Sequence, residues 1–250
     1  MADLISTQAY VFMLVVCRCA SAVMLLPALG ESDPPPMLRA GIAFALAALL
    51  TPAISGELPP VPHSFLRLAG LIAGELLAGG VLGWLARLIA LALAATGQIM
   101  SLATGLSSVL QQDPLLGAQS SALGRVFSLA APVVILSTGL YALPLTALAG
   151  SYHVFPAGGM LPPGDLAETA LRAVTASFGL ALRLASPFLL ISLLWQSGLG
   201  LLSRLVPHIQ VYFAAMPAQI LGGLLLLALL GGGIVTAWFG ATQEAFSALP

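Results

Sequence analysis

Long stretches without a charged side chain constrain this chain more than any other feature of its sequence. They cover residues 88–112, 126–164, 184–203 and 205–243. A helix needs about 20 apolar residues to cross the hydrocarbon core of a bilayer, which is roughly 30 Å thick. Each stretch is at least that long, so the sequence predicts an integral membrane protein built from helices.

The composition excludes several other classes of protein. Only 7% of the residues are charged and 59% are hydrophobic, whereas a soluble domain carries about 25% charged residues. All eight basic residues are arginines, they are scattered along the chain, and the formal net charge is −1. Binding to nucleic acid requires clustered cations, so we expect no nucleic-acid partner.

Proline and polar clusters divide the chain into six expected helices. These cover residues 10–26, 38–50, 65–95, 122–148, 166–202 and 208–239. The breaks between them are rich in proline, which lacks an N–H group and disfavours helix in the residue before it. No internal repeat divides the chain further. We therefore predict an all-α fold with about six long hydrophobic helices in a single membrane domain, residues 1–250.

Four charged residues lie inside the expected helices: Arg18, Glu75, Arg87 and Arg183. A charge at the bilayer centre costs roughly 2.5–3.5 kcal/mol on insertion scales, so each needs a partner or a route to water. Glu75 and Arg87 are separated by about 18 Å along one helix, too far for direct pairing. We expect structural or assembly ion pairs. The alternatives are a proton or substrate relay at Glu75 and arginines that extend to the membrane surface.

Small residues at helical spacing form two GxxxG motifs, Gly70 with Gly74 and Gly79 with Gly83. Such spacing lets helix backbones approach closely inside a membrane. The pairs indicate either packing between helices of this chain or contact with another subunit.

Signatures of catalysis are missing from the sequence. It has no Walker A motif, no GxGxxG after a strand and no GxSxG. Its three histidines do not share a metal-ligand spacing. Ser151-Tyr152-His153 near Asp165 is the most enzyme-like group, but nothing nearby supplies an oxyanion hole. We expect no enzyme activity, metal or cofactor, and a small solute transporter using Glu75 is the alternative function.

A polar interruption extends from Thr104 to Pro114 between hydrophobic helices. Irregular backbone at membrane depth is tolerated only inside protein or along a wet cavity. The interruption is therefore either such a buried loop or an ordinary surface turn.

Several motifs follow one another along nearly the whole chain. They are Arg18 before Leu25-Leu26-Pro27, Glu75 before Gly79, Gly97-Gln98-Ile99, Gly105-Leu106-Ser107, Asp113-Pro114, Phe155-Pro156-Ala157-Gly158, the segment 199–207, and Met216-Pro217. In this order and spacing they resemble the FliR family of type III secretion export-gate proteins, whose virulence-system members are called SctT. His208 and Ala215 depart from the residues common in that family.

The resemblance implies a FliP-like portion joined to a FliQ-like hairpin. It implies a hetero-oligomeric pore in the bacterial inner membrane, built with FliP-like and FliQ-like subunits, with FlhB-like and FlhA-like export components beside it. Unfolded substrates would cross this pore, with flagellar use favoured and the flagellar basal body as its location.

The resemblance also implies a pore plug near residues 106–117, formed by Leu110, Gln111, Gln112, Asp113 and Pro114. Gln111 and Gln112 stand where the family commonly has apolar residues, which predicts a wetter seal.

Overall fold

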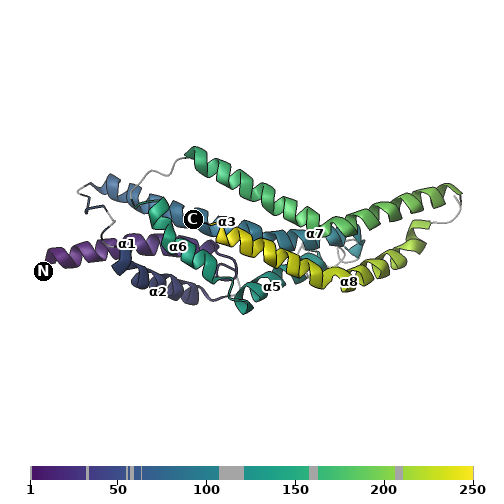
Figure 1. Ribbon diagram of the computed structural model, residues 1–250, viewed down its shortest axis with the longest axis horizontal. Coiled ribbons are helices and arrows are strands. Elements are labelled where there is room, and N and C mark those ends of the chain that lie inside the picture. Colours follow the sequence, from purple (N-terminus) through teal and green to yellow (C-terminus); the bar gives the residue numbers. More distant parts are fainter. Residues whose placement is uncertain are drawn as a thin grey trace. The chain divides into compact units, whose positions relative to one another are not determined.

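The computed structural model describes residues 2–31, 34–54, 56, 59–62, 64–106, 121–157, 163–205 and 211–249, with side chains from Thr7 onwards. Regular structure in these residues is entirely helical (Figure 1), which confirms the predicted all-α fold. The helices are α1 (Ala2–Leu25), α2 (Pro36–Ile54), α3 (Phe65–Ala103), α5 (Ala122–Ser137), α6 (Ala142–Val154), α7 (Pro163–Leu205) and α8 (Val211–Ser247).

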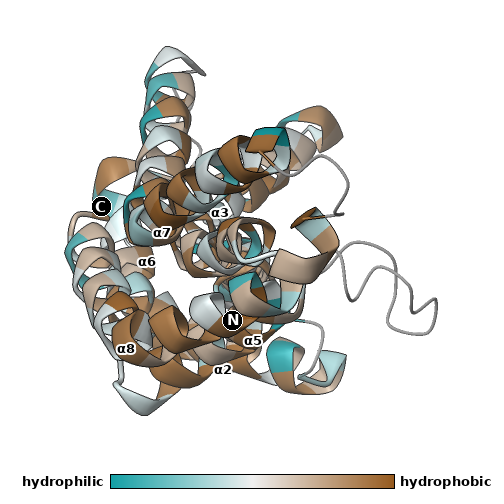
Figure 2. Cartoon of the chain, turned by 90° about the vertical axis from the view of Figure 1, so that its right-hand side faces the viewer, coloured by the Kyte–Doolittle hydropathy of each residue, from teal (hydrophilic) through white to brown (hydrophobic). Residues whose placement is uncertain are grey.

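Five of these helices are long and apolar enough to cross a membrane: α1, α2, α3, α7 and α8. Helices α5 and α6 add a sixth candidate span if they count as one, although they meet at a bend of 72°. Figure 2 colours most of the helical residues as hydrophobic, with hydrophilic positions scattered among them. The prediction of about six long hydrophobic helices is confirmed.

The break between α5 and α6 differs from the single helix expected over residues 122–148. Gly139 adopts φ +75°, in the left-handed region that glycine tolerates and that ends a helix. Its N–H donates to the Leu136 carbonyl at 3.4 Å, and its own carbonyl accepts from Ala142 N–H at 3.0 Å. A lone glycine in an apolar run is a weak stop signal, so the sequence did not predict this turn.

Helix α3 also continues past the expected end at residue 95. Thr96 does not interrupt it, because its hydroxyl donates to the Ala92 carbonyl one turn earlier, at 2.8 Å. The helix ends before Gly105, which has φ +77°. Hydropathy alone therefore placed this boundary too early.

The chain forms two compact units, and α3, α5, α7 and α8 each contribute residues to both. Unit 1 comprises Met1–Ile89, Ile135–Val174 and Gln243–Pro250, and unit 2 comprises Ala90–Val134 and Thr175–Thr242.

The core of unit 1 is an apolar cluster drawn from α1, α2, α3 and α6. Its buried members are Val15, Cys19, Ala22, Ala47, Ile54, Leu82, Ala147, Leu148 and Tyr152. A second cluster near the start of α1 contains Tyr10, Val11, Leu14 and Leu71. Leu71 and Leu82 therefore pack α3 against α1 at two positions along the helices. This packing brings charged side chains of α1 and α3 close enough to interact.

In unit 2, α3 makes close contacts with α5 and α8. A Cβ added at Gly97 on α3 would lie 2.6 Å from the Leu123 carbonyl oxygen on α5. The close approach of α5 therefore requires glycine at this position of α3. The side chain of Gln219 on α8 donates from Nε2 to the Ala103 carbonyl at 3.1 Å. This bond satisfies one of the carbonyls that the end of a helix leaves open.

Candidate functional site

Unit 1 contains a buried ion pair between Arg18 on α1 and Glu75 on α3. Each residue is only 1% exposed. Arg18 Nε donates to Glu75 Oε2 at 2.6 Å, and Nη2 donates to Oε1 at 3.1 Å. Both carboxylate oxygens therefore face the guanidinium in the two-bond geometry that suits arginine.

The remaining donors of Arg18 reach α6. Nη1 donates to Ser151 Oγ at 3.2 Å, and Nη2 also donates to the Phe155 carbonyl at 2.9 Å. Phe155 caps the C-terminus of α6, where the helix dipole favours a positive charge. Ser151 Oγ in turn donates to the Leu148 carbonyl at 2.7 Å. Arg18 thus joins three helices through one side chain.

The ring of Tyr152 covers the guanidinium of Arg18. The central carbon Cζ lies 3.8 Å from the ring centroid, which is within the range of a cation–π contact. The Tyr152 hydroxyl is buried and has no hydrogen-bond partner among the residues that the structure describes. The ring contact, and not the hydroxyl, is therefore what Tyr152 contributes to the cluster.

Two of the four motif glycines allow α3 to reach α1 at this cluster. A Cβ at Gly79 would collide with the Arg18 carbonyl oxygen and with Ser21 Oγ, and one at Gly83 would lie 2.6 Å from the Ala22 carbonyl oxygen. No atom of the described residues lies within 4 Å of a Cβ at Gly70 or Gly74. The second motif is therefore filled by α1, whereas the first faces open space within this chain.

Arg87 pairs with Glu31 and not with Glu75. Its Nη2 lies 3.3 Å from Glu31 Oε2, and its Nη1 donates to the Gly30 carbonyl at 3.3 Å. The two side chains are 27% and 32% exposed. Arg18 pairs with Glu75, and Glu31, which follows Arg18 in the sequence, pairs with Arg87, which follows Glu75 on α3. Helices α1 and α3 therefore run parallel. The arginine belongs to α1 in the first pair and to α3 in the second.

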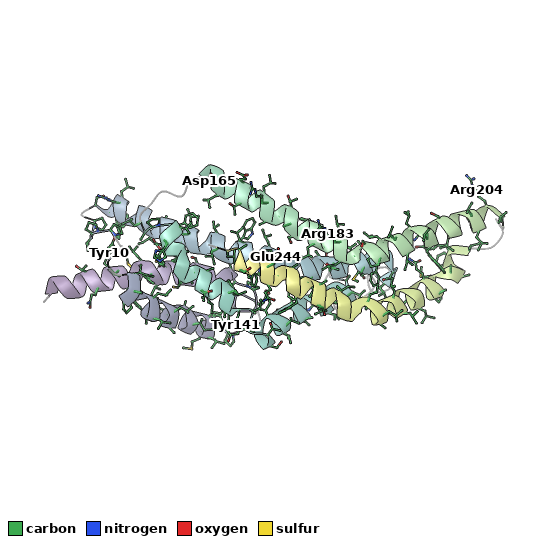
Figure 3. The ribbon with its side chains drawn as sticks, viewed as in Figure 1. Tyr10, Tyr141, Asp165, Arg183, Arg204 and Glu244 are labelled. Carbon is green, nitrogen blue, oxygen red and sulfur yellow. The ribbon has the colours of Figure 1, made fainter. Side chains whose placement is uncertain are left out.

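Arg183 lies in the middle of α7 and is exposed. Figure 3 shows it between Asp165 near the start of this helix and Arg204 near its end. Among the residues that the structure describes, no acidic group forms an ion pair with it. The four predicted charges thus fall into two paired sets, Arg18 with Glu75 and Arg87 with Glu31, and one exposed arginine.

The expected plug residues, Leu110 to Pro114, lie outside the described residues. Described structure stops at Leu106 and resumes at Ser121, whose Oγ accepts from Gly124 N–H at 3.1 Å at the start of α5. The plug stays a prediction from the sequence.

Sequence reasoning did not assign Ser151, Tyr152 or Phe155 to the cluster. Ser151 and Tyr152 stood out only as an enzyme-like run, and their spacing from Arg18 carries no periodic signal. Within the described ranges, no group of three or more histidine, cysteine, aspartate or glutamate side chains could hold a metal ion. The cluster offers charge pairing and helix fastening, because Arg18 occupies both oxygens of Glu75.

Long apolar helices and an ion pair buried among them define a multi-span helical membrane protein. The chain belongs to the family described as bacterial export proteins, family 1, whose model matches residues 9–245.

Named relatives agree with this family over most of their length. The flagellar biosynthetic protein FliR of Caulobacter vibrioides is 32% identical over 237 residues, covering 95% of this chain and 94% of the relative. FliR of Escherichia coli is 27% identical, covering 85% and 81%. The Yop proteins translocation protein T of Yersinia pestis is 28% identical, covering 87% and 84%.

Proposed function

We propose that this chain is a pore subunit of a type III protein export gate in the bacterial inner membrane, serving the flagellar system. The family match over residues 9–245 is the observation that carries the proposal. The relatives are named for flagellar biosynthesis and for translocation of Yop proteins, and the family that covers them is described as bacterial export proteins. Flagellar use is favoured by the 32% identity to the Caulobacter protein over 95% of this chain.

The gate would be a hetero-oligomer with FliP-like and FliQ-like subunits, in contact with FlhB-like and FlhA-like components. The uneven burial of the helices supports such an assembly. In the apolar windows of α1 and α3, 44% and 50% of residues are buried within the chain, against 28% in α7 and only 6% in α8. Helices α7 and α8 thus have apolar surface left for lipid or neighbouring subunits.

In this role the chain catalyses no reaction and helps to line and seal the passage for unfolded substrates. A solute transporter using Glu75 has less support, because Arg18 Nε and Nη2 already bond both carboxylate oxygens of Glu75. A transport site needs a group that can exchange partners with its substrate.

Deletion and tagged complementation test the proposal. Cells lacking this chain should stop releasing flagellar substrates, and a tagged copy should restore release and retain FliP-like and FliQ-like chains after detergent extraction. An unrelated tagged membrane protein at equal abundance is the control. Normal substrate release without the chain, or a tagged chain extracted without either partner, would refute the proposal.

A further inference from the structure

Arg183 differs from every other arginine in the described part of the chain. Arg18, Arg87 and Arg172 have carboxylate partners. The others lie in the first or last turn of a helix, close to its end: Arg39, Arg67, Arg125 and Arg204. Arg183 has neither a carboxylate partner nor a position at a helix end. It lies near the middle of α7, and none of the ion pairs found among described residues includes it.

The surface around Arg183 is apolar and open. Leu182, next to Arg183 in the sequence, is 51% exposed, and Leu190, two turns further along the Arg183 face, is 63% exposed. Gly179 lies one turn before Arg183 on the same helix face, and none of the described residues comes within 4 Å of a Cβ placed there. A second helix can therefore approach α7 closely at the level of the guanidinium.

The charge of Arg183 is not neutralised within α7. Ser186 Oγ donates at 2.7 Å to the backbone carbonyl of Arg183, so this hydroxyl does not accept from the guanidinium. Each end of α7 lies about 30 Å away along the helix axis, at 1.5 Å per residue. An arginine side chain cannot span that distance to reach a helix end.

We propose that Arg183 forms an ion pair with a carboxylate on an apolar helix of a neighbouring subunit. This rests on the proposed function and deepens it by naming the chemistry of one subunit contact. An arginine on an apolar face requires a counter-charge, and a carboxylate matches the planar guanidinium with two parallel hydrogen bonds. The face formed by Gly179, Arg183 and Leu190 accordingly fits a helix with one aspartate or glutamate among apolar residues.

Three substitutions test the contact in the extracted complex. We expect Arg183→Leu and Arg183→Glu to lower the amount of co-purified neighbouring subunit per tagged chain by at least about tenfold, the loss expected when one partner of a buried interface pair is removed. Arg183→Lys should retain more, because it keeps the charge. Arg172→Leu is the matched control, since Arg172 is exposed on the same helix and pairs with Glu168 one turn away. Assembly of Arg183→Leu at the wild-type level would overturn the proposal.

Charge-reversal suppression tests the contact even if Arg183→Glu lowers the abundance of the chain itself. Cells carrying Arg183→Glu are selected for restored substrate release. The expected suppressor changes an aspartate or glutamate of another gate subunit to arginine or lysine. A suppressor at Glu244 or another acidic residue of this chain, or suppressors only in lipid synthesis, would overturn the proposal. Failure of the wild-type chain to co-purify with any subunit would instead refute the proposed function.

Discussion

Arg18 and Glu75 lie 57 residues apart in the sequence and form a two-bond ion pair that is closed off from solvent. Ser151, the Tyr152 ring and the Phe155 carbonyl complete the shell around Arg18. Because these groups come from α1, α3 and the end of α6, the pair fastens three helices of unit 1. The ion pair therefore holds the three helices in their arrangement. Single and double substitutions of the pair should consequently differ in how much they destabilise the chain.

Arg18→Leu or Glu75→Leu alone should be severely destabilising, by about 3–5 kcal/mol, because each leaves the other charge buried and unpaired. The double variant should lose less than the sum of the two, since it leaves neither charge behind. The measurement is the aggregation temperature of the detergent-extracted chain. Leucine at both Glu168 and Arg172 is the control, because that exposed pair contributes at most about 1 kcal/mol. Strictly additive losses would show that Arg18 and Glu75 are not coupled.

Glu75→Gln separates a structural role from proton transfer. The amide keeps the shape of the side chain but removes the counter-charge of Arg18, so we expect fewer assembled complexes in the membrane. Export per assembled complex should remain near the wild-type rate. The check is substrate release normalised to the amount of intact complex. Loss of release from complexes present at normal levels would instead support a relay at Glu75.

Tyr152→Phe should be tolerated, because the ring contact with Arg18 remains and the lost hydroxyl bonds to none of the described residues. Tyr152→Leu removes the cation–π contact, which contributes about 0.5–2 kcal/mol, and should lower the aggregation temperature. The two variants are compared at equal protein concentration in one detergent. If Tyr152→Phe lowered the aggregation temperature as much as Tyr152→Leu does, the hydroxyl and not the ring contact would be the stabilising group, which would contradict this prediction.

The two glycine motifs should respond differently to alanine. Gly79→Ala and Gly83→Ala place a methyl group against the backbone of α1, so both should lower the stability of the chain itself. Gly70→Ala and Gly74→Ala meet no atom in the described part of the chain and should leave that stability unchanged. The aggregation temperature of the chain and the yield of complex are measured for all four. Reduced complex yield with unchanged stability would identify Gly70 and Gly74 as a subunit contact, and equal destabilisation by all four would contradict the difference in packing.

Shortening the segment 110–112 should raise the resting leak of ions and small solutes while the complex still assembles. The expectation comes from the sequence, where a polar, proline-bounded interruption matches the family's plug. Replacing Gln111 and Gln112 together with leucine should tighten the seal and slow export, because apolar side chains exclude water. Solute flux is compared at matched amounts of complex. A shortened segment with wild-type leak would exclude this segment as the plug.

Much of the fold was predictable because membrane helices depend on local properties. Length, hydropathy and proline placed most of the helices, since a bilayer requires long runs of apolar residues with satisfied backbones. The turn at Gly139 was missed because its signal is one residue in an otherwise helical run. Helix α3 continues through Thr96 because the Thr96 hydroxyl bonds within the helix, a compensation that hydropathy does not record.

The site was predictable in its residue types and not in its partners. A charge among apolar residues shows that a partner is needed, which singled out Arg18 and Glu75. Which groups meet depends on how distant helices pack, and no local spacing connects Arg18 to Ser151 or Phe155. Arg87 illustrates the same limit, since its partner Glu31 comes from the connection after α1.

The mass of the native complex tests the central claim, that this chain is one subunit of a hetero-oligomeric export gate. The tagged chain is extracted from membranes under mild conditions, and the intact particle is analysed by native mass spectrometry together with the identities of its subunits. The account predicts a discrete particle containing one copy of this chain with several FliP-like and FliQ-like chains. A particle made only of copies of this chain, or the chain alone, would contradict it.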